Sequence, residues 1–254
     1  GQTGMLSGMK EIQLRSGTRM PALGLGTWKS EPGEVGAAIV EAVKIGYRHF
    51  DCAAIYGNEA EIGEALARCI GEQLVTRDEL WVTSKLWNDR HAEEDVVPAL
   101  QQTLADLKLD YLDLYLVHWP VAHKKGVLGP ETAADMIPLD ELPMSTTWEG
   151  MQSASEAGLA RSIGVSNCSA PKLAGLMDSA RIAPAVNQVE LHPYLQQNGL
   201  VAWCQDAGIG VTACSPLGSR DRVEQMKAPD EPVLLEDTTL VSVAARHDWS
   251  PARG

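Results

Sequence analysis

The sequence predicts an α/β protein folded as one (β/α) barrel. Apolar segments of strand length alternate with segments of helical periodicity about seven times along the chain. The strand segments are continuous apolar runs, which is typical of parallel strands covered on both faces. Composition does not change abruptly along the chain. We therefore expect a flexible leader over residues 1–8 and a single barrel domain over residues 9–254.

The order of the elements supports this fold. Two strands joined by a turn at Ser16–Gly17 are expected first, over residues 10–17 and 19–28. Further strands are expected over residues 49–54, 80–87, 112–120, 160–167, 185–193 and 209–219. Helical segments, with apolar residues three and four positions apart, are expected over residues 32–44, 59–70, around 100–107, 146–158, 170–180 and 199–208.

An open, doubly wound sheet is the competing architecture for such a pattern. Its dinucleotide-binding form carries the motif G-x-G-x-x-G between a strand and a helix. The stretch "LGLGTW" supplies only Gly24 and Gly26 and has no third glycine. We therefore reject this alternative.

Charge and composition restrict the class of partner. The formal net charge is −13, which argues against nucleic acid or an anionic membrane as the main ligand. No apolar run is long enough to span a membrane, and the first residues do not resemble a secretory signal. The five cysteines are scattered and odd in number, which favours reduced thiols in a cytoplasmic protein.

Polar residues follow the apolar runs at the ends of successive strands. In a (β/α) barrel these ends meet at one mouth, where the active site is built. Each residue taken alone has a structural explanation, such as a buried histidine that completes the core. Together they favour a site, because Lys and Asp are rarely buried without a partner. The residues are Asp51, Lys85, His118, Ser166, Asn167, Gln188 and Ser215.

The chemistry of this set centres on Tyr56, five residues after Asp51. A phenol with a pKa near 10 is a weak acid at neutral pH, and a neighbouring ammonium can lower that pKa by roughly 1–3 units. We expect Lys85 to lower the pKa of Tyr56, Asp51 to hold Lys85, and His118 to orient the substrate oxygen.

The remaining strand-end groups suit a carboxamide ligand. The side chains of Ser166, Asn167 and Gln188 offer amides and a hydroxyl, which could bind the carboxamide of a nicotinamide. Together with Tyr56, they predict hydride transfer to a carbonyl with Tyr56 as the proton donor. A metal-dependent barrel hydrolase would instead need clustered ligands. The six histidines are dispersed, so no metal site is expected.

These residues lie in stretches that resemble the aldo-keto reductase family, most closely its aldose/aldehyde reductase branch. The resemblance covers nearly the whole chain from about residue 9. The matching stretches are "LGLGTWKS", "GYRHFDCAAIYGNEAEIG", "SKLWN", "LADLKLDYLDLYLVHWP", "SIGVSN", "PAVNQVELHPYLQQ", "SPLGSRDR" and "LLED".

The resemblance implies a (β/α)8 TIM barrel with an N-terminal β-hairpin cap and NADPH-dependent reduction of aldehydes or ketones by a cytoplasmic monomer. The family's catalytic tetrad falls on Asp51, Tyr56, Lys85 and His118. Its cofactor contacts fall on Thr27, Asp51, Ser166, Asn167, Gln188, Cys214, Ser215, Leu217 and Ser219. Its aromatic substrate pocket falls on Trp28, Trp87 and Trp119.

The chain departs from the family's pattern at three points. Cys214 replaces the tyrosine that usually stacks on the nicotinamide, and Cys168 replaces a common aromatic. The chain also ends at Gly254, before the family's last strand and helix and its 2′-phosphate ligands. If Gly254 is the last residue of the molecule, we expect weak or absent binding of NADPH. These departures keep open a non-catalytic, cofactor-binding or redox-sensing member of the superfamily as the alternative function.

Overall fold

The structure is a computed structural model that describes residues 10–220 and 230–253. Its centre is a parallel sheet of seven strands in the order β11-β10-β9-β6-β5-β4-β3. The expected leader, residues 1–8, lies outside the described residues. The strands are β3 (Leu25–Gly26), β4 (His49–Asp51), β5 (Trp81–Leu86), β6 (Leu112–Val117), β9 (Ala160–Ser166), β10 (Val186–Glu190) and β11 (Gly210–Cys214).

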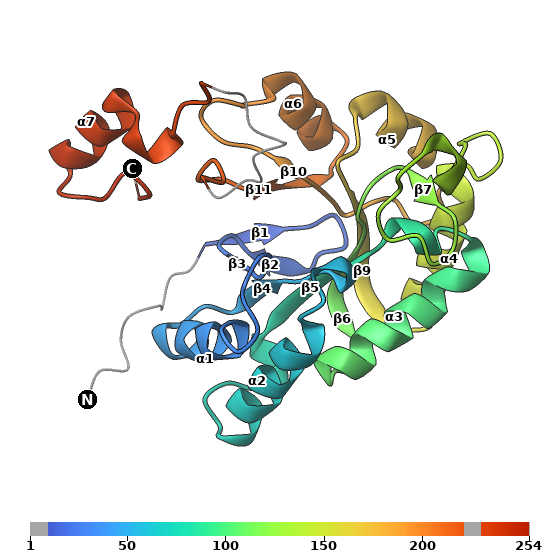
Figure 1. Cartoon of the computed structure of the whole chain (residues 1–254), viewed down its shortest axis with the longest axis horizontal. Helices are drawn as coiled ribbons and strands as arrows, with labels where there is room; N and C mark the ends of the chain where they lie inside the picture. The colour runs from blue at the N-terminus through green and yellow to red at the C-terminus, as the bar shows by residue number, and fades with distance from the viewer. Residues whose placement is uncertain (1–9, 221–229, 254) are drawn as a thin grey trace.

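The strand order never reverses along this sheet, so the doubly wound alternative is excluded. Right-handed crossovers that all progress in one direction place their helices on one side. Figure 1 shows the sheet curled, with the helices around its outside. The helices are α1 (Val35–Ile45), α2 (Glu59–Gly71), α3 (Glu93–Leu107), α4 (Met144–Glu156), α5 (Ala170–Met177), α6 (Asn198–Asp206) and α7 (Thr238–Arg246). The predicted α/β barrel architecture is thereby confirmed in its coarse form.

The N-terminal strands differ from the sequence prediction. The expected strand over residues 19–28 is divided into two: β2 (Arg19–Pro21) pairs antiparallel with β1 (Glu11–Gln13), and β3 begins the parallel sheet. Pro21 has no backbone N–H and stands at the end of the β1–β2 ladder, opposite Glu11. The chain is therefore free to leave the hairpin and join β4.

The two faces of the sheet bury different sets of side chains. On the outer face, Val82 and Leu86 of β5 join a core cluster with the helices. On the inner face, Trp81 packs with Leu14 and Met20 of the hairpin segment. Because side chains alternate between the two faces of a strand, Trp81, Thr83 and Lys85 all point to the inner face. The inner face thus becomes polar toward the C-terminal ends of the strands.

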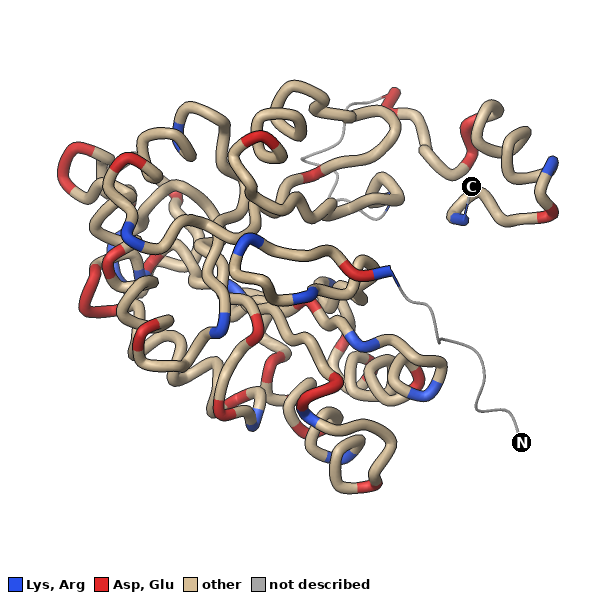
Figure 2. Tube along the Cα trace, turned by 180° about the vertical axis from the view of Figure 1, so that it is seen from behind, with Lys and Arg blue, Asp and Glu red and all other residues tan. Residues whose placement is uncertain are grey.

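Charged residues are distributed over the outer layer of the molecule. Figure 2 shows acidic and basic residues interspersed along the outer helices and loops, within a chain of net charge −13. Helix α7 lies to one side of the sheet, beyond the short 3-10 turn η6 (Leu234–Glu236) (Figure 1). No described helix is long and apolar enough to cross a membrane.

Candidate active site

An ion pair between β4 and β5 forms the centre of the polar inner face. The Lys85 ammonium lies 2.5 Å from Asp51 Oδ1 and donates to the Cys52 carbonyl oxygen at 2.8 Å. Gln188 Nε2, on β10, donates to the other carboxylate oxygen of Asp51 at 2.7 Å. Lys85 is only 1% exposed. The structure therefore brings Asp51, Lys85 and Gln188 together, although Asp51 and Gln188 are 137 positions apart in the chain.

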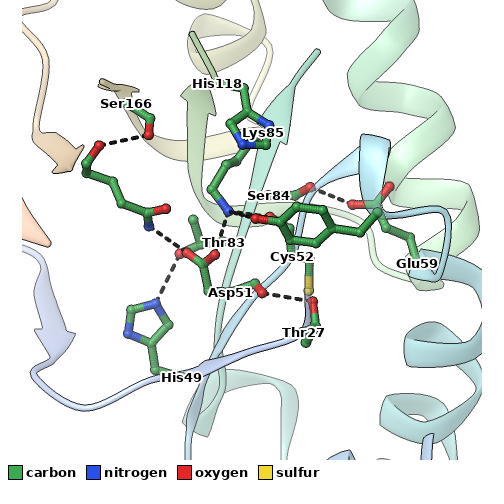
Figure 3. A network of polar contacts seen from close by, with 12 residues as sticks. Thr27, His49, Asp51, Cys52, Glu59, Thr83, Ser84, Lys85, His118 and Ser166 are labelled. Carbon is green, nitrogen blue, oxygen red and sulfur yellow. Dashed lines mark hydrogen bonds and ion pairs between the residues drawn. The ribbon is translucent and has the colours of Figure 1, made fainter. Parts of the chain in front are cut away.

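Tyr56 approaches this pair from the short turn η1 (Ala54–Tyr56) that follows β4. The Tyr56 hydroxyl lies 3.4 Å from the ammonium nitrogen of Lys85. Figure 3 shows this lysine beside Asp51. Gly57, directly after the turn, has a φ of +69°, which favours glycine and lets the chain reverse into α2. The phenol is thereby presented to the mouth of the barrel next to the ammonium.

The charge on Lys85 is maintained despite its burial. Burial alone would lower the pKa of Lys85, but the Asp51 carboxylate and the Tyr56 hydroxyl more than offset this, so the pKa lies above its ordinary value. A buried ammonium needs such a partner, because an unpaired buried charge is costly. Lys85 is therefore cationic at neutral pH.

Lys85 lowers the pKa of Tyr56, as expected, but the net shift of this pKa is upward. Burial raises the pKa of Tyr56 above 10, and the opposing effect of Lys85 is smaller. The Asp51 carboxylate beside Lys85 neutralises much of the ammonium's field and itself raises the pKa of the phenol. At neutral pH Tyr56 is therefore fully protonated, which is the form that a proton donor requires.

The segment that carries Tyr56 is also anchored from the side of β3. The Thr27 hydroxyl and backbone N–H both donate to the Asp51 carbonyl oxygen, at 2.9 and 3.1 Å. Asn58 precedes the first residue of α2 but does not cap that helix with its side chain. Its amide nitrogen donates instead to the Thr27 carbonyl oxygen at 2.8 Å. Sequence reasoning did not find this role of Asn58, because an asparagine there looks like an ordinary helix cap.

His118 follows β6 and lies against two aromatic rings. Its imidazole makes edge contacts with Tyr56 and Trp87, with ring centroids 5.9 and 5.1 Å apart. Burial, assisted by the Lys85 charge, lowers the pKa of His118 to about 3. Its Nδ1 atom is buried and has no hydrogen-bond partner among the described residues. His118 is therefore a neutral imidazole at neutral pH, with one buried nitrogen that no described residue bonds.

The neutral state of His118 predicts a measurable pH dependence. Folding lowers the pKa of His118 from its ordinary value of 6.5. The contribution of His118 to the free energy of unfolding is therefore fully present above pH 6.5 and is lost as the pH falls toward 3. The loss has a slope of up to about 1.4 kcal/mol per pH unit. We expect His118→Gln to lose less stability than the unmodified protein between pH 7 and pH 4, in urea unfolding at both pH values. Equal losses would contradict a neutral, buried His118.

The predicted carboxamide-binding residues lie together at the ends of β9 and β10. The Ser166 hydroxyl donates to the Gln188 carbonyl oxygen at 2.7 Å, and Asn167 Nδ2 donates to Ser166 Oγ and to the His118 carbonyl oxygen. Asn167 has a φ of +59°, a conformation that asparagine tolerates better than most residues. No described residue donates to the amide oxygens of Asn167 or Gln188, so both can accept from a carboxamide NH2 group. The donor and acceptor set fits a nicotinamide.

The predicted phosphate-binding segment follows β11. Ser215 and Ser219 both have positive φ, and Ser219 Oγ lies 2.6 Å from Ser215 Oγ. Leu217, between them, is exposed. Cys214 ends β11 on the inner face, and burial raises the pKa of its thiol to about 11. Cys214 is therefore an uncharged thiol at neutral pH, close enough to Tyr56 to affect its pKa.

The three predicted pocket tryptophans have different surroundings. Trp28 stacks on Tyr56 with ring centroids 6.2 Å apart and is 52% exposed. Trp87 lies against His118, and its indole N–H donates to the Leu128 carbonyl oxygen. Trp119 makes no ring contact with Tyr56 or His118 among the described residues. It lines a groove of about 490 Å³ together with Asn167, Cys168 and Trp203. Trp28 therefore contacts Tyr56 directly, and Trp87 contacts the His118 ring.

Comparison with known sequences identifies the family. The sequence model of the Aldo/keto reductase family matches residues 22–253. Aldo-keto reductase family 1 member A1 of Pongo abelii is 52% identical over 244 residues, covering 95% of this chain and 74% of that protein. An aldo/keto reductase of Synechocystis is 50% identical over 248 residues, covering 98% of this chain and 76% of that protein. The chain belongs to the aldo/keto reductase family.

Solved structures agree with this assignment. The aldose reductase of Schistosoma japonicum superposes with a TM-score of 0.87 at 39% identity, covering 96% of this chain and 77% of that one. The aldo-keto reductase of Bombyx mori in complex with NADP has a TM-score of 0.84 at 41% identity, covering 96% of this chain and 78% of that one. The predicted class, an NAD(P)H-dependent oxidoreductase, is thereby confirmed. Within the described residues, no group of three or more His, Cys, Asp and Glu side chains could hold a metal ion.

Proposed function

We propose that this protein reduces an aldehyde or ketone to an alcohol and that Tyr56 donates the proton. The cofactor is NADPH, in agreement with the family and with the NADP-bound structural relative. The observation that carries the proposal is the placement of the Tyr56 hydroxyl 3.4 Å from the buried, Asp51-paired Lys85 ammonium.

The proposed reaction assigns a separate task to each side chain. NADPH, when bound, supplies a hydride to the carbonyl carbon. Tyr56 gives its hydroxyl proton to the carbonyl oxygen, and the Lys85 ammonium lies beside the phenolate that this leaves. Asp51 holds Lys85 in position, and neutral His118 can donate one hydrogen bond to orient the substrate oxygen.

The cofactor would be held along β9, β10 and the segment after β11. The amide and hydroxyl groups of Ser166, Asn167 and Gln188 would bind the nicotinamide carboxamide. Thr27 and Asp51 would face its ribose, and Ser215, Leu217 and Ser219 the pyrophosphate. Cys214 would offer a small polarizable surface in place of a stacking aromatic ring.

The proposed substrate is a small carbonyl compound with an apolar portion. Trp28, Trp87 and Trp119 would line its pocket, with Trp28 and Trp87 nearest to the reacting oxygen. The loop over residues 122–144 contains no aromatic residue, which favours an open pocket. A relative named as an aldose reductase supports sugar aldehydes as one class to test.

Four further expectations remain proposals. The hairpin β1–β2, whose side chains pack with Trp81 and Leu114, would close the N-terminal end of the barrel. Residues 9–254 would form one domain, and residues 9, 221–229 and 254 of this range lie outside the described residues. The protein would act as a monomer, and it would act in the cytoplasm. Size-exclusion chromatography with light scattering tests the oligomeric state.

The direct test is NADPH oxidation with a panel of aldehydes, keto acids and aldoses, with the alcohol product quantified. We expect one alcohol formed for each NADPH consumed, and slower oxidation with NADH. NADPH binding by calorimetry, without consumption on any member of the panel, would contradict the enzyme and favour the non-catalytic alternative. The unusual Cys214 gives that alternative its one specific support.

A further inference from the structure

Glu59 is a buried carboxylate directly behind the segment that carries Tyr56. It is the first residue of α2, three positions after Tyr56, and only 5% of it is exposed. Figure 3 shows its side chain directed toward β5, on the opposite side of that strand from Lys85. No basic side chain forms an ion pair with Glu59 among the described residues. A carboxylate without a cation in such a place is costly, so its hydrogen bonds matter.

Two hydroxyl groups satisfy the Glu59 carboxylate. Ser84 Oγ, on β5, lies 2.5 Å from Glu59 Oε1, and Thr103 Oγ1, on α3, lies 3.0 Å from Glu59 Oε2. Both of these side chains are fully buried. Glu59 therefore joins the start of α2 to the outer face of β5 and to α3 at the same time.

The bond to Ser84 is linked to the site through one peptide unit. Ser84 precedes Lys85, and neighbouring side chains of a strand point to opposite faces. The strand that Glu59 holds from outside is thus the strand whose inner face carries the Lys85 ammonium. Any shift of α2 relative to β5 changes the separation of Tyr56 Oη and Lys85 Nζ.

The Tyr56 segment lies at a surface cleft, and none of residues 54–56 is buried. Ala54, Ile55 and Gly57, which flank Tyr56, line this cleft of about 490 Å³, and it also reaches Glu59. A segment with one side open to a cleft has fewer packing contacts to oppose its displacement. Polar attachments therefore contribute to its position: Lys85 to the Cys52 carbonyl oxygen, Asn58 to the Thr27 carbonyl oxygen, and Glu59 to Ser84 and Thr103.

We propose that Glu59 is a positioning residue, which fixes the Tyr56 hydroxyl beside the Lys85 ammonium by bonding the start of α2 to Ser84 and Thr103. The inference rests on the proposed role of Tyr56 as proton donor. Glu59 does not touch the reacting atoms, and its effect passes through the 54–57 segment and β5. A misplacement of about 1 Å at a reacting group can cost about 100-fold in rate.

The electrostatic surroundings of Glu59 give the proposal a second measurable consequence. Burial raises the pKa of Glu59 to about 7, against the two hydroxyl hydrogen bonds that lower it. Asp106 of α3 also raises this pKa and Lys85 lowers it, while Tyr115 of β6 and Cys52 lie within electrostatic reach. With a raised pKa, the stability from this group is present below its ordinary value and is lost as the pH rises through about 7.

The first experiment compares Glu59→Ala, Glu59→Gln and Ser84→Ala in single-turnover NADPH oxidation, so that product release does not mask the chemical step. We expect Glu59→Ala to lower the rate by about 10–100-fold with NADPH affinity changed by less than about twofold. Glu59→Gln can still accept from one hydroxyl and donate to the other, so its rate should stay within about threefold. Ser84→Ala should lower the single-turnover rate by a smaller factor. The double variant Glu59→Ala with Ser84→Ala should be no slower than Glu59→Ala alone, because both changes break the same hydrogen bond.

The matched control is Glu64→Ala, which removes an exposed carboxylate from the same helix. Within the described part of the chain, Glu64 pairs with Lys108 and has no hydrogen bond or ion pair with β5. The single-turnover rate and NADPH affinity of Glu64→Ala should equal those of the unmodified protein. Thermal unfolding at pH 5 and pH 8 supplies the second readout: the unmodified protein should lose more stability over this interval than Glu59→Gln.

Crystal structures of Glu59→Ala and the unmodified protein separate failure of this inference from failure of the proposed function. A longer Tyr56 Oη–Lys85 Nζ distance in the variant supports the positioning role, whether or not any carbonyl is turned over. An unchanged distance, or an unchanged single-turnover rate in a folded variant, overturns it. Absence of turnover in the unmodified protein would contradict the proposed reaction and leave the distance as the deciding measurement.

Discussion

Replacing Tyr56 with phenylalanine is expected to lower carbonyl reduction by about 100- to 10,000-fold, the usual contribution of a positioned general acid. The substitution removes one oxygen atom and retains the ring that stacks on Trp28. Burial already keeps Tyr56 protonated at neutral pH, so the lost group is the proton donor itself. Steady-state NADPH oxidation with the best substrate of the panel measures the effect.

Binding measurements separate this loss from damage to the site. We expect the NADPH dissociation constant of Tyr56→Phe, by fluorescence or calorimetry, to stay within about threefold, since the hydroxyl contributes at most one modest hydrogen bond. Tyr115→Phe is the matched control, because this buried tyrosine of β6 lies on the outer face. Unchanged turnover in Tyr56→Phe would refute the assignment of the proton donor.

Replacing Lys85 with methionine is expected to reduce both turnover and stability. The change keeps most of the side-chain volume but leaves the Asp51 carboxylate, whose side chain is 18% exposed, without its cation. Breaking a buried pair from one side typically costs about 3–5 kcal/mol. Turnover should fall by about 100-fold or more, because the phenolate formed at Tyr56 loses its stabilising charge. Urea unfolding and NADPH oxidation measure the two effects.

A second substitution distinguishes the two roles of Lys85. In the double variant Asp51→Asn with Lys85→Met, no carboxylate is left unpaired, so much of the lost stability should return. Turnover should not return, since the ammonium is still missing beside Tyr56. Recovery of turnover without recovery of stability would contradict the proposed separation of roles. An equal stability loss in the single and double variants would show that Asp51 is adequately solvated without Lys85.

Several features of the site could be predicted from the sequence because they depend on topology. Asp51, Lys85 and His118 each end an apolar run, and the C-terminal ends of parallel strands meet at one edge. The division of residues 19–28 between β2 and β3 was missed, because one apolar run can serve two sheets. The groove that Trp119 lines with Asn167 and Trp203 could not be predicted, because a sequence gives the end of a strand but not the direction of the side chain.

The barrel, the family and the candidate residues can be predicted from the sequence, since repeated strand–helix periodicity and long collinear motifs are properties of the chain. The charge states of those residues follow only from the folded structure. It reversed the expected direction of the Tyr56 pKa, made His118 a neutral imidazole and brought Glu59 behind the Tyr56 segment. The reason is physical: a pKa depends on burial and on distances between atoms of different strands and helices, and these exist only after the chain has folded.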